Sequence, residues 1–172
     1  GAVSSADAPS YKDVMEEGGF TVVNSDLLDW YLEEEYGRDF DDGNINEASW
    51  KSINKSDAAS SFGNGETAIF VVGRVGGEAN DLPTDMTAVI DGSYDAGDVF
   101  ADLDSTALYD DDRNEGNDWD EGDTYLNLTN REEELVDLVC ENFENVIIVC
   151  NSANAMDLAW TNDYEQVRTD RL

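Results

Sequence analysis

The chain contains no histidine and has only two cysteines and two prolines among its 172 residues. Without histidine, it lacks the commonest general base and the commonest ligand of zinc and iron. Basic residues are also scarce, because 9 Lys and Arg stand against 41 Asp and Glu, for a formal net charge of −32. Nucleic acids and anionic membrane surfaces would be repelled by this charge, so we expect neither as a partner.

Long apolar runs are missing as well. No run approaches the roughly 20 residues that a membrane-spanning helix needs, so we expect no span. No signal peptide is recognisable, although a leader removed before Gly1 would leave no trace in this sequence. The compartment stays open, with an extracellular or cell-surface location favoured over a cytoplasmic one.

The two cysteines, Cys140 and Cys150, are not expected to form a disulfide. Cys140 falls near the end of a predicted helix and Cys150 near the end of the strand that follows. Because helix and strand run antiparallel, the strand carries Cys150 beyond the Cα separation of about 7 Å that a disulfide tolerates. We expect both side chains to be small buried hydrophobic groups.

The residues that are present favour a folded domain. Hydrophobic residues make up 40% of the chain, and it contains 4 Trp, 7 Tyr and 6 Phe, which argues against disorder. Its length fits a single domain spanning 1–172. The acidity has two general explanations, solubility through self-repulsion or adaptation to high salt, and neither specifies a function.

Two uniformly apolar segments predict the centre of a sheet. The run at 67–72 shows no alternation, which is typical of a strand covered on both faces in a parallel sheet. A second such strand at 146–150 follows a helix at 130–143, which Thr129 and Glu132 begin as a capping box. The order strand, helix, strand predicts an α/β fold, a three-layer α/β/α sandwich with a mostly parallel sheet.

Weaker patterns predict the remaining elements. Val14 and Met15 are expected to point inward from the first helix, and Leu27, Leu28, Tyr31 and Leu32 to form the buried face of the second. Irregular excursions are expected near 37–65 and 85–123. The predicted elements are helices at 11–18, 27–36 and around 47–53, and short strands at 20–23 and 87–90.

The acidic segment DDDRNEGNDWDEGD at 110–123 invites a test for calcium. An EF-hand loop needs oxygen ligands at positions 1, 3 and 5 and a glycine at position 6. Counting from Asp118 or from Asp112 places a glycine at position 5 in both cases. Because the pattern fails twice, we expect a solvated acidic loop and no metal site.

The first candidate for chemistry follows the strand at 67–72. Gly73, Gly76 and Gly77 allow the backbone a tight turn, and Glu78 comes directly after them. Ligands of open α/β sheets bind beyond the carboxyl ends of the strands, where Glu78 would lie. Considered without any resemblance, Glu78 is better explained as an ordinary exposed loop acid, since most glutamates are solvated.

Three segments carry a resemblance to a known family. They are GGFTVVNSDLLDWY at 18–31, AIFVVGRVGGEANDLP at 68–83 and LNLTNREEELVDLVCENFENVIIVCNSANAMDLAW at 126–160. In their order and spacing, over nearly the whole chain, they resemble the C-terminal α/β sandwich domain of glycoside hydrolase family 3, the β-glucosidases and their relatives.

The resemblance implies that Glu78 is a general acid/base. Glycoside hydrolysis with retention uses two carboxyl groups about 5–5.5 Å apart, one as nucleophile and one as proton donor. A donor needs a raised pKa, which a closed or anionic site supplies. Arg74 and Asp81 would position the turn or a sugar hydroxyl, with a plain salt bridge as the alternative for each. The substrate implied is a β-linked glucoside or oligosaccharide, and no cofactor is implied.

The nucleophile of that family belongs to another domain. It is an aspartate in an S-D-W-like motif of a (β/α)₈ barrel, which takes about 250 residues. Asn117-Asp118-Trp119 resembles this motif only superficially, because it falls in the acidic loop. The family's first and last sandwich strands are also missing. We therefore expect a domain fragment that is inactive without a barrel domain, supplied in cis or in trans.

Two non-catalytic functions stay open. Sheet edges left unpaired by the missing strands would invite assembly into a homo-oligomer or filament. Carbohydrate binding would instead use exposed tryptophans. Trp30 and Trp160 are expected in the core because each has periodic apolar neighbours, which leaves Trp119 in the acidic loop as the candidate substrate-binding side chain.

Overall fold

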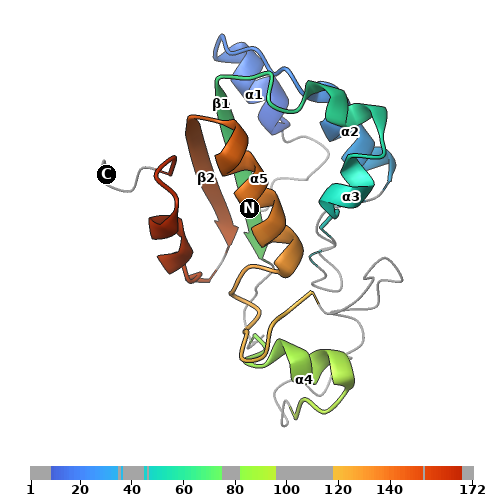
Figure 1. Ribbon diagram of the computed structural model, residues 1–172, viewed down its shortest axis with the longest axis vertical. Coiled ribbons are helices and arrows are strands. Elements are labelled where there is room, and N and C mark those ends of the chain that lie inside the picture. Colours follow the sequence, from blue (N-terminus) through green and yellow to red (C-terminus); the bar gives the residue numbers. More distant parts are fainter. Residues whose placement is uncertain are drawn as a thin grey trace.

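The computed structural model describes residues 9–34, 36, 45, 47–74, 82–95, 118–152 and 154–167. These residues form a mixed α/β fold with a small parallel sheet (Figure 1). The elements in chain order are α1 (Tyr11–Glu17), α2 (Ser25–Glu33), α3 (Trp50–Ile53), the 3₁₀ helix η2 (Asp57–Ser61), β1 (Thr67–Arg74), α4 (Met86–Asp91), α5 (Asn130–Asn142), β2 (Asn145–Ser152) and the 3₁₀ helix η4 (Ala159–Asp163).

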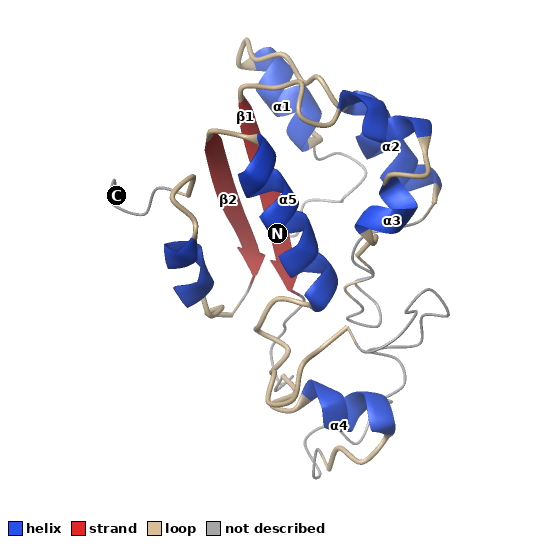
Figure 2. Ribbon diagram, viewed as in Figure 1, coloured by secondary structure: helices blue, strands red, loops and turns tan. Residues whose placement is uncertain are grey.

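The sheet described here has two parallel strands, as predicted. β1 and β2 pair in register from Thr67 opposite Asn145 to Arg74 opposite Ser152. Figure 2 shows both arrows pointing the same way, with α5 running alongside them in the opposite direction and beginning near the arrowheads. The carboxyl ends of both strands and the amino end of α5 therefore meet at one edge of the sheet.

Helix α5 forms as its sequence predicts. The Glu132 N–H donates to Thr129 Oγ1 at 3.1 Å, and the Thr129 N–H donates to Glu132 Oε2 at 2.9 Å. This capping box satisfies backbone groups that the first turn leaves without partners. Leu135, Val136 and Cys140 are buried, so one face of the helix packs in the core.

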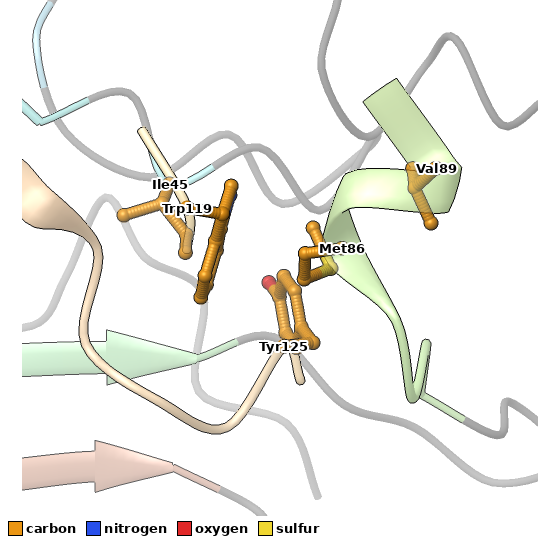
Figure 3. Packing of buried hydrophobic residues seen from close by; sticks show 5 residues of the cluster. All are labelled: Ile45, Met86, Val89, Trp119 and Tyr125. Atoms are coloured by element: carbon orange, nitrogen blue, oxygen red, sulfur yellow. The ribbon is translucent and has the colours of Figure 1, made fainter. Parts of the chain in front are cut away.

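The buried apolar residues form three clusters. One lies between the sheet and α5 and is extended by residues from 156–167. A second joins α2 and α3 to Leu135 of α5. The third surrounds Trp119 and Tyr125 beside α4, as Figure 3 shows. The acidic loop thus contributes to a core, where the sequence predicted a solvated segment.

The sheet is covered on one face by the described residues. Burial alternates along β1, with Val72 buried and its neighbour Val71 40% exposed. Ile69 is 40% exposed and Ile147, its partner in register, is 50% exposed. Since α5 lies on the other face, no described helix covers these side chains, and the expected cover on both faces is not found here.

The predicted strand at 87–90 is wrong, because these residues belong to α4. The Asp85 carboxylate accepts a hydrogen bond from Ala88 N at 3.0 Å and so caps the helix start. Gly92, with φ of 75°, ends the helix in the left-handed conformation that glycine tolerates. Two local caps therefore outweigh the strand preference of the β-branched residues between them.

The amino-terminal predictions hold in part. Helices α1 and α2 form close to the expected bounds, but 20–23 is a loop and not a strand. Helix α1 buries no residue, and Val14 is exposed, so its inward orientation was wrong. In α2, Leu27 and Tyr31 pack in a core cluster, whereas Leu28 and Leu32 are exposed. A four-residue apolar run with no neighbouring strand does not specify a strand.

Both cysteines are free. Cys140 is buried as expected, but Cys150 is exposed, which corrects that prediction. The residue lies near the carboxyl end of β2, where the cover provided by α5 is incomplete. Among the helices that the structure describes, none combines the length and apolarity that crossing a membrane requires.

Candidate functional site

The structure describes two of the four candidate residues. Arg74 is the last residue of β1, and Trp119 lies in the loop that leads to α5. Both side chains are buried. Glu78 and Asp81 lie outside the described residues, so no geometry is given for them.

All five N–H groups of the Arg74 guanidinium have acceptors. Nη1 and Nη2 donate to the two carboxylate oxygens of Glu132, at 2.8 and 2.6 Å. The remaining donors reach three backbone carbonyl oxygens, those of Gly73, Tyr125 and Asn127. An arginine with no remaining donor is placed to hold the end of β1 and has none to offer a sugar hydroxyl.

Two aromatic rings enclose the same guanidinium. Its central carbon lies 5.9 Å from the centroid of the Trp119 ring and 5.8 Å from that of Tyr125. A desolvated cation over such rings gains an attraction of about 2 kcal/mol. Trp119 thus packs against Arg74 in the core. It is not the exposed sugar-binding side chain that the sequence predicted.

Glu132 has two structural roles. Its carboxylate pairs with Arg74, and Oε2 also accepts the Thr129 N–H of the capping box. The amino end of α5 is therefore fixed directly to the carboxyl end of β1. Glu78 follows Arg74 by four residues in the sequence, so the fixed end of β1 lies close to it along the chain.

Asp118 completes the start of α5. Its Oδ1 accepts the Arg131 N–H at 3.1 Å and lies 3.8 Å from Arg131 Nε, while its carbonyl oxygen accepts the Asn130 N–H at 2.8 Å. A carboxylate at a helix start is favoured by the helix dipole. Asp118 therefore has a structural role at the start of α5. This role accounts for the aspartate beside Trp119 without the nucleophile function of the S-D-W-like motif.

Glu47 is a functional candidate that sequence reasoning missed. Its Oε1 accepts hydrogen bonds from the Tyr31 hydroxyl at 2.8 Å and from Ala48 N at 2.7 Å. Burial raises the pKa of this carboxyl to about 7, and the charges of Glu132 and Asp118 add to the effect. From the sequence, Glu47 was predicted only to lie near the start of a helix. The sequence around a single acidic residue does not show whether that residue is buried.

We call these five residues, Glu47, Arg74, Asp118, Arg131 and Glu132, the arginine–carboxylate cluster. Arg131 Nη1 also donates to the Glu47 carbonyl oxygen at 2.9 Å, which connects the segment before α3 to α5. The cluster thus joins three distant parts of the chain at one edge of the sheet. Within the described ranges, no group of three or more His, Cys, Asp or Glu side chains is arranged to hold a metal ion.

Comparison of the chain with protein-family models, with curated proteins and with solved structures gives no match. The resemblance to glycoside hydrolase family 3 therefore rests on its sequence motifs.

The burial of Trp119 gives a first testable prediction. Its emission, obtained as the difference between the unmodified protein and Trp119→Phe, should resist quenching by acrylamide and should not respond to aryl glucosides, because the ring is enclosed. The matching Trp160→Phe difference serves as a control, since Trp160 is only partly buried. Quenching of Trp119 as strong as that of Trp160 would contradict the enclosed position.

Proposed function

We propose that this chain is the acid/base-bearing α/β domain of a retaining β-glucosidase-like glycoside hydrolase. Glu78 is the proton donor, and a (β/α)₈ barrel domain, in cis or in trans, brings the nucleophilic aspartate. The domain has the three-layer α/β/α architecture of that family. Its substrate is a β-linked glucoside or oligosaccharide, and the domain is inactive without the barrel.

The observation that carries this proposal is the parallel pairing of β1 and β2. The two strands belong to the segments at 68–83 and 126–160, which are two of the three that resemble the family. Their parallel pairing, with α5 directly before β2, agrees with the arrangement that the resemblance implies. The glycine-rich turn then leaves from the carboxyl edge of a parallel sheet, where α/β proteins bind their ligands.

The arginine–carboxylate cluster supports the proposal in a second way. Catalytic carboxyl groups need positions fixed to within about 0.5 Å, which requires a rigid base. Arg74 stands four residues before Glu78 and is held by Glu132 and three backbone carbonyl groups. The buried ion pair thus provides a fixed attachment for the turn, although Arg74 itself does not contact substrate in this mechanism.

In the proposed reaction the barrel aspartate attacks the anomeric carbon while the protonated Glu78 donates its proton to the leaving oxygen. A glycosyl ester with the aspartate forms, and the aglycone departs as an alcohol. Glu78, now ionised, removes a proton from water as the water attacks the anomeric carbon. The product sugar keeps its β configuration, and both carboxyl groups return to their first states.

The test combines the chain with a family barrel domain and compares Glu78→Gln with the unmodified domain. For phenyl β-glucoside, a poor leaving group, kcat/KM should fall about 10²- to 10⁴-fold, because the departing oxygen needs a proton. For 2,4-dinitrophenyl β-glucoside, which leaves unprotonated, kcat/KM should change little. Glu66→Gln, an exposed acid just before β1, is the matched control. Equal losses on both substrates, or none on either, would remove Glu78 from this role.

A non-catalytic assembly unit is the second candidate. The observation in its favour is the exposed apolar side of the sheet, which carries Ile69, Val71 and Ile147. A carbohydrate-binding role is less well supported, since Trp119 is enclosed by protein. Sedimentation at low and at high salt separates these possibilities, because screening of the −32 charge would let an assembly unit associate.

A further inference from the structure

One side of the sheet is made entirely of uncharged residues. In the register of β1 and β2, alternate paired positions point to the same side. The side opposite α5 carries Thr67, Ile69, Val71, Gly73, Asn145, Ile147, Val149 and Asn151. We call this set the open sheet face. In a chain with 29% charged residues, a face of eight positions without one charge is unusual for a surface in contact with water.

The centre of this face is aliphatic and exposed. Ile69 lies opposite Ile147 and Val71 opposite Val149, so four β-branched side chains form one block. Ile69 and Val71 are each 40% exposed and Ile147 is 50% exposed. Parallel sheets occur almost only with both faces covered. The open sheet face therefore has the composition of a buried layer, and no helix among the described residues lies over it.

The dimensions of the face suit one helix. Strands of eight residues at about 3.3 Å per residue are about 26 Å long, and two strands with their side chains are about 10 Å wide. A helix has a diameter of about 10–12 Å and rises 1.5 Å per residue, so about 17 residues would lie along the face. The face has a footprint of roughly 260 Å², which is about the area that one helix of this length covers.

The net charge of the chain distinguishes between the partners that could cover the open sheet face. Two copies of this chain would bring together two molecules of net charge −32, and the area of the face would not compensate for their repulsion. A partner with basic residues beside its apolar stripe would instead be attracted to a chain of net charge −32. Size and charge thus favour the same kind of occupant.

We propose that the open sheet face is the docking site of an amphipathic helix from another polypeptide, with an aliphatic stripe flanked by Lys or Arg. The stripe covers Ile69, Val71, Ile147 and Val149, while the basic flanks face the acidic surface of this chain. This inference does not depend on the proposed glycosidase activity, but it assigns the second helical layer of the proposed three-layer architecture to another polypeptide.

The test uses a synthetic 18-residue helix with leucines at i, i+3, i+4 and i+7 spacing and lysines on both flanks. It should shift the methyl NMR signals of the four aliphatic residues of the face. Ile147→Thr, which keeps the β-branched shape, should weaken binding at least 10-fold. Leu32→Gln removes an aliphatic residue on α2 that is 76% exposed, against 50% for Ile147, and should leave binding unchanged. A peptide of identical composition with a scrambled stripe should bind at least 10-fold more weakly.

Three outcomes would overturn the proposal. Equal binding of the scrambled peptide would show that charge alone attracts it, and equal effects of Ile147→Thr and Leu32→Gln would place the contact elsewhere. A concentration-dependent dimer in sedimentation that Ile147→Thr abolishes would identify a second copy as the occupant. Unperturbed methyl signals at saturating peptide would show that the face does not accept a helix.

Discussion

Replacing Arg74 by methionine is expected to lower the free energy of unfolding by about 3–5 kcal/mol, a large part of the stability of an ordinary domain. The substitution leaves the buried carboxylate of Glu132 without its cation. It also removes the donors to the carbonyl groups of Gly73, Tyr125 and Asn127. Urea unfolding followed by circular dichroism measures the loss.

Lys55→Met is the matched control for this experiment. It makes the same change in net charge at an exposed position, so it separates the local ion pair from the general effect of charge. Adding Glu132→Gln to Arg74→Met should recover part of the loss, because the unpaired charge disappears. Equal stability of Arg74→Met and Lys55→Met would show that the buried pair does not hold β1 to α5.

The second large expected effect is that the free energy of unfolding depends on pH because of Glu47. Its pKa in the folded protein is about 7, above the ordinary value of 4.5. The folded state therefore binds this proton more tightly than the unfolded state does. The stabilisation is complete below about pH 4.5 and is lost as the pH rises toward 7. Because one pKa unit corresponds to about 1.4 kcal/mol, ionised Glu47 costs up to about 3 kcal/mol at pH 8.

Glu47→Gln should remove this cost. The amide oxygen can still accept the hydrogen bonds from Tyr31 and Ala48, while the neutral group no longer opposes Glu132 and Asp118. We expect the variant to be more stable than the unmodified protein at pH 8 and no more stable at pH 5. Glu141→Gln, on the exposed side of α5, controls for the general loss of one negative charge. If the stability of both variants depended on pH in the same way, the raised pKa of Glu47 would be contradicted.

The parts of the fold that the sequence predicted are those with strong local patterns. The capping box of Thr129 and Glu132 and the apolar spacing after it predicted α5 to within one residue. The run at 67–72 predicted β1, although the strand extends to Arg74. Such patterns suffice because capping and periodic burial act within a single element.

The strand predicted at 87–90 failed for a local reason, because the caps formed by Asp85 and Gly92 outweigh the β-branched character of the residues between them. The other failures depend on contacts between distant segments. Trp119 looked solvent-exposed among acidic neighbours, yet it packs beside Arg74, whose burial depends on Glu132, 58 residues later in the chain. Glu47 carried no local signal, since its raised pKa depends mainly on its burial, with smaller contributions from the charges of Glu132 and Asp118.

The central hypothesis is that Glu78 donates and accepts the proton in a retaining glycosidase. The most direct measurement is the product that Glu78→Ala forms from 2,4-dinitrophenyl β-glucoside and azide, with the barrel domain present. Azide needs no general base, so it should attack the glycosyl ester in the space that the carboxylate vacated, raising kcat and giving β-glucosyl azide. Glucose as the only product, at a rate that azide does not change, would contradict the assignment of Glu78.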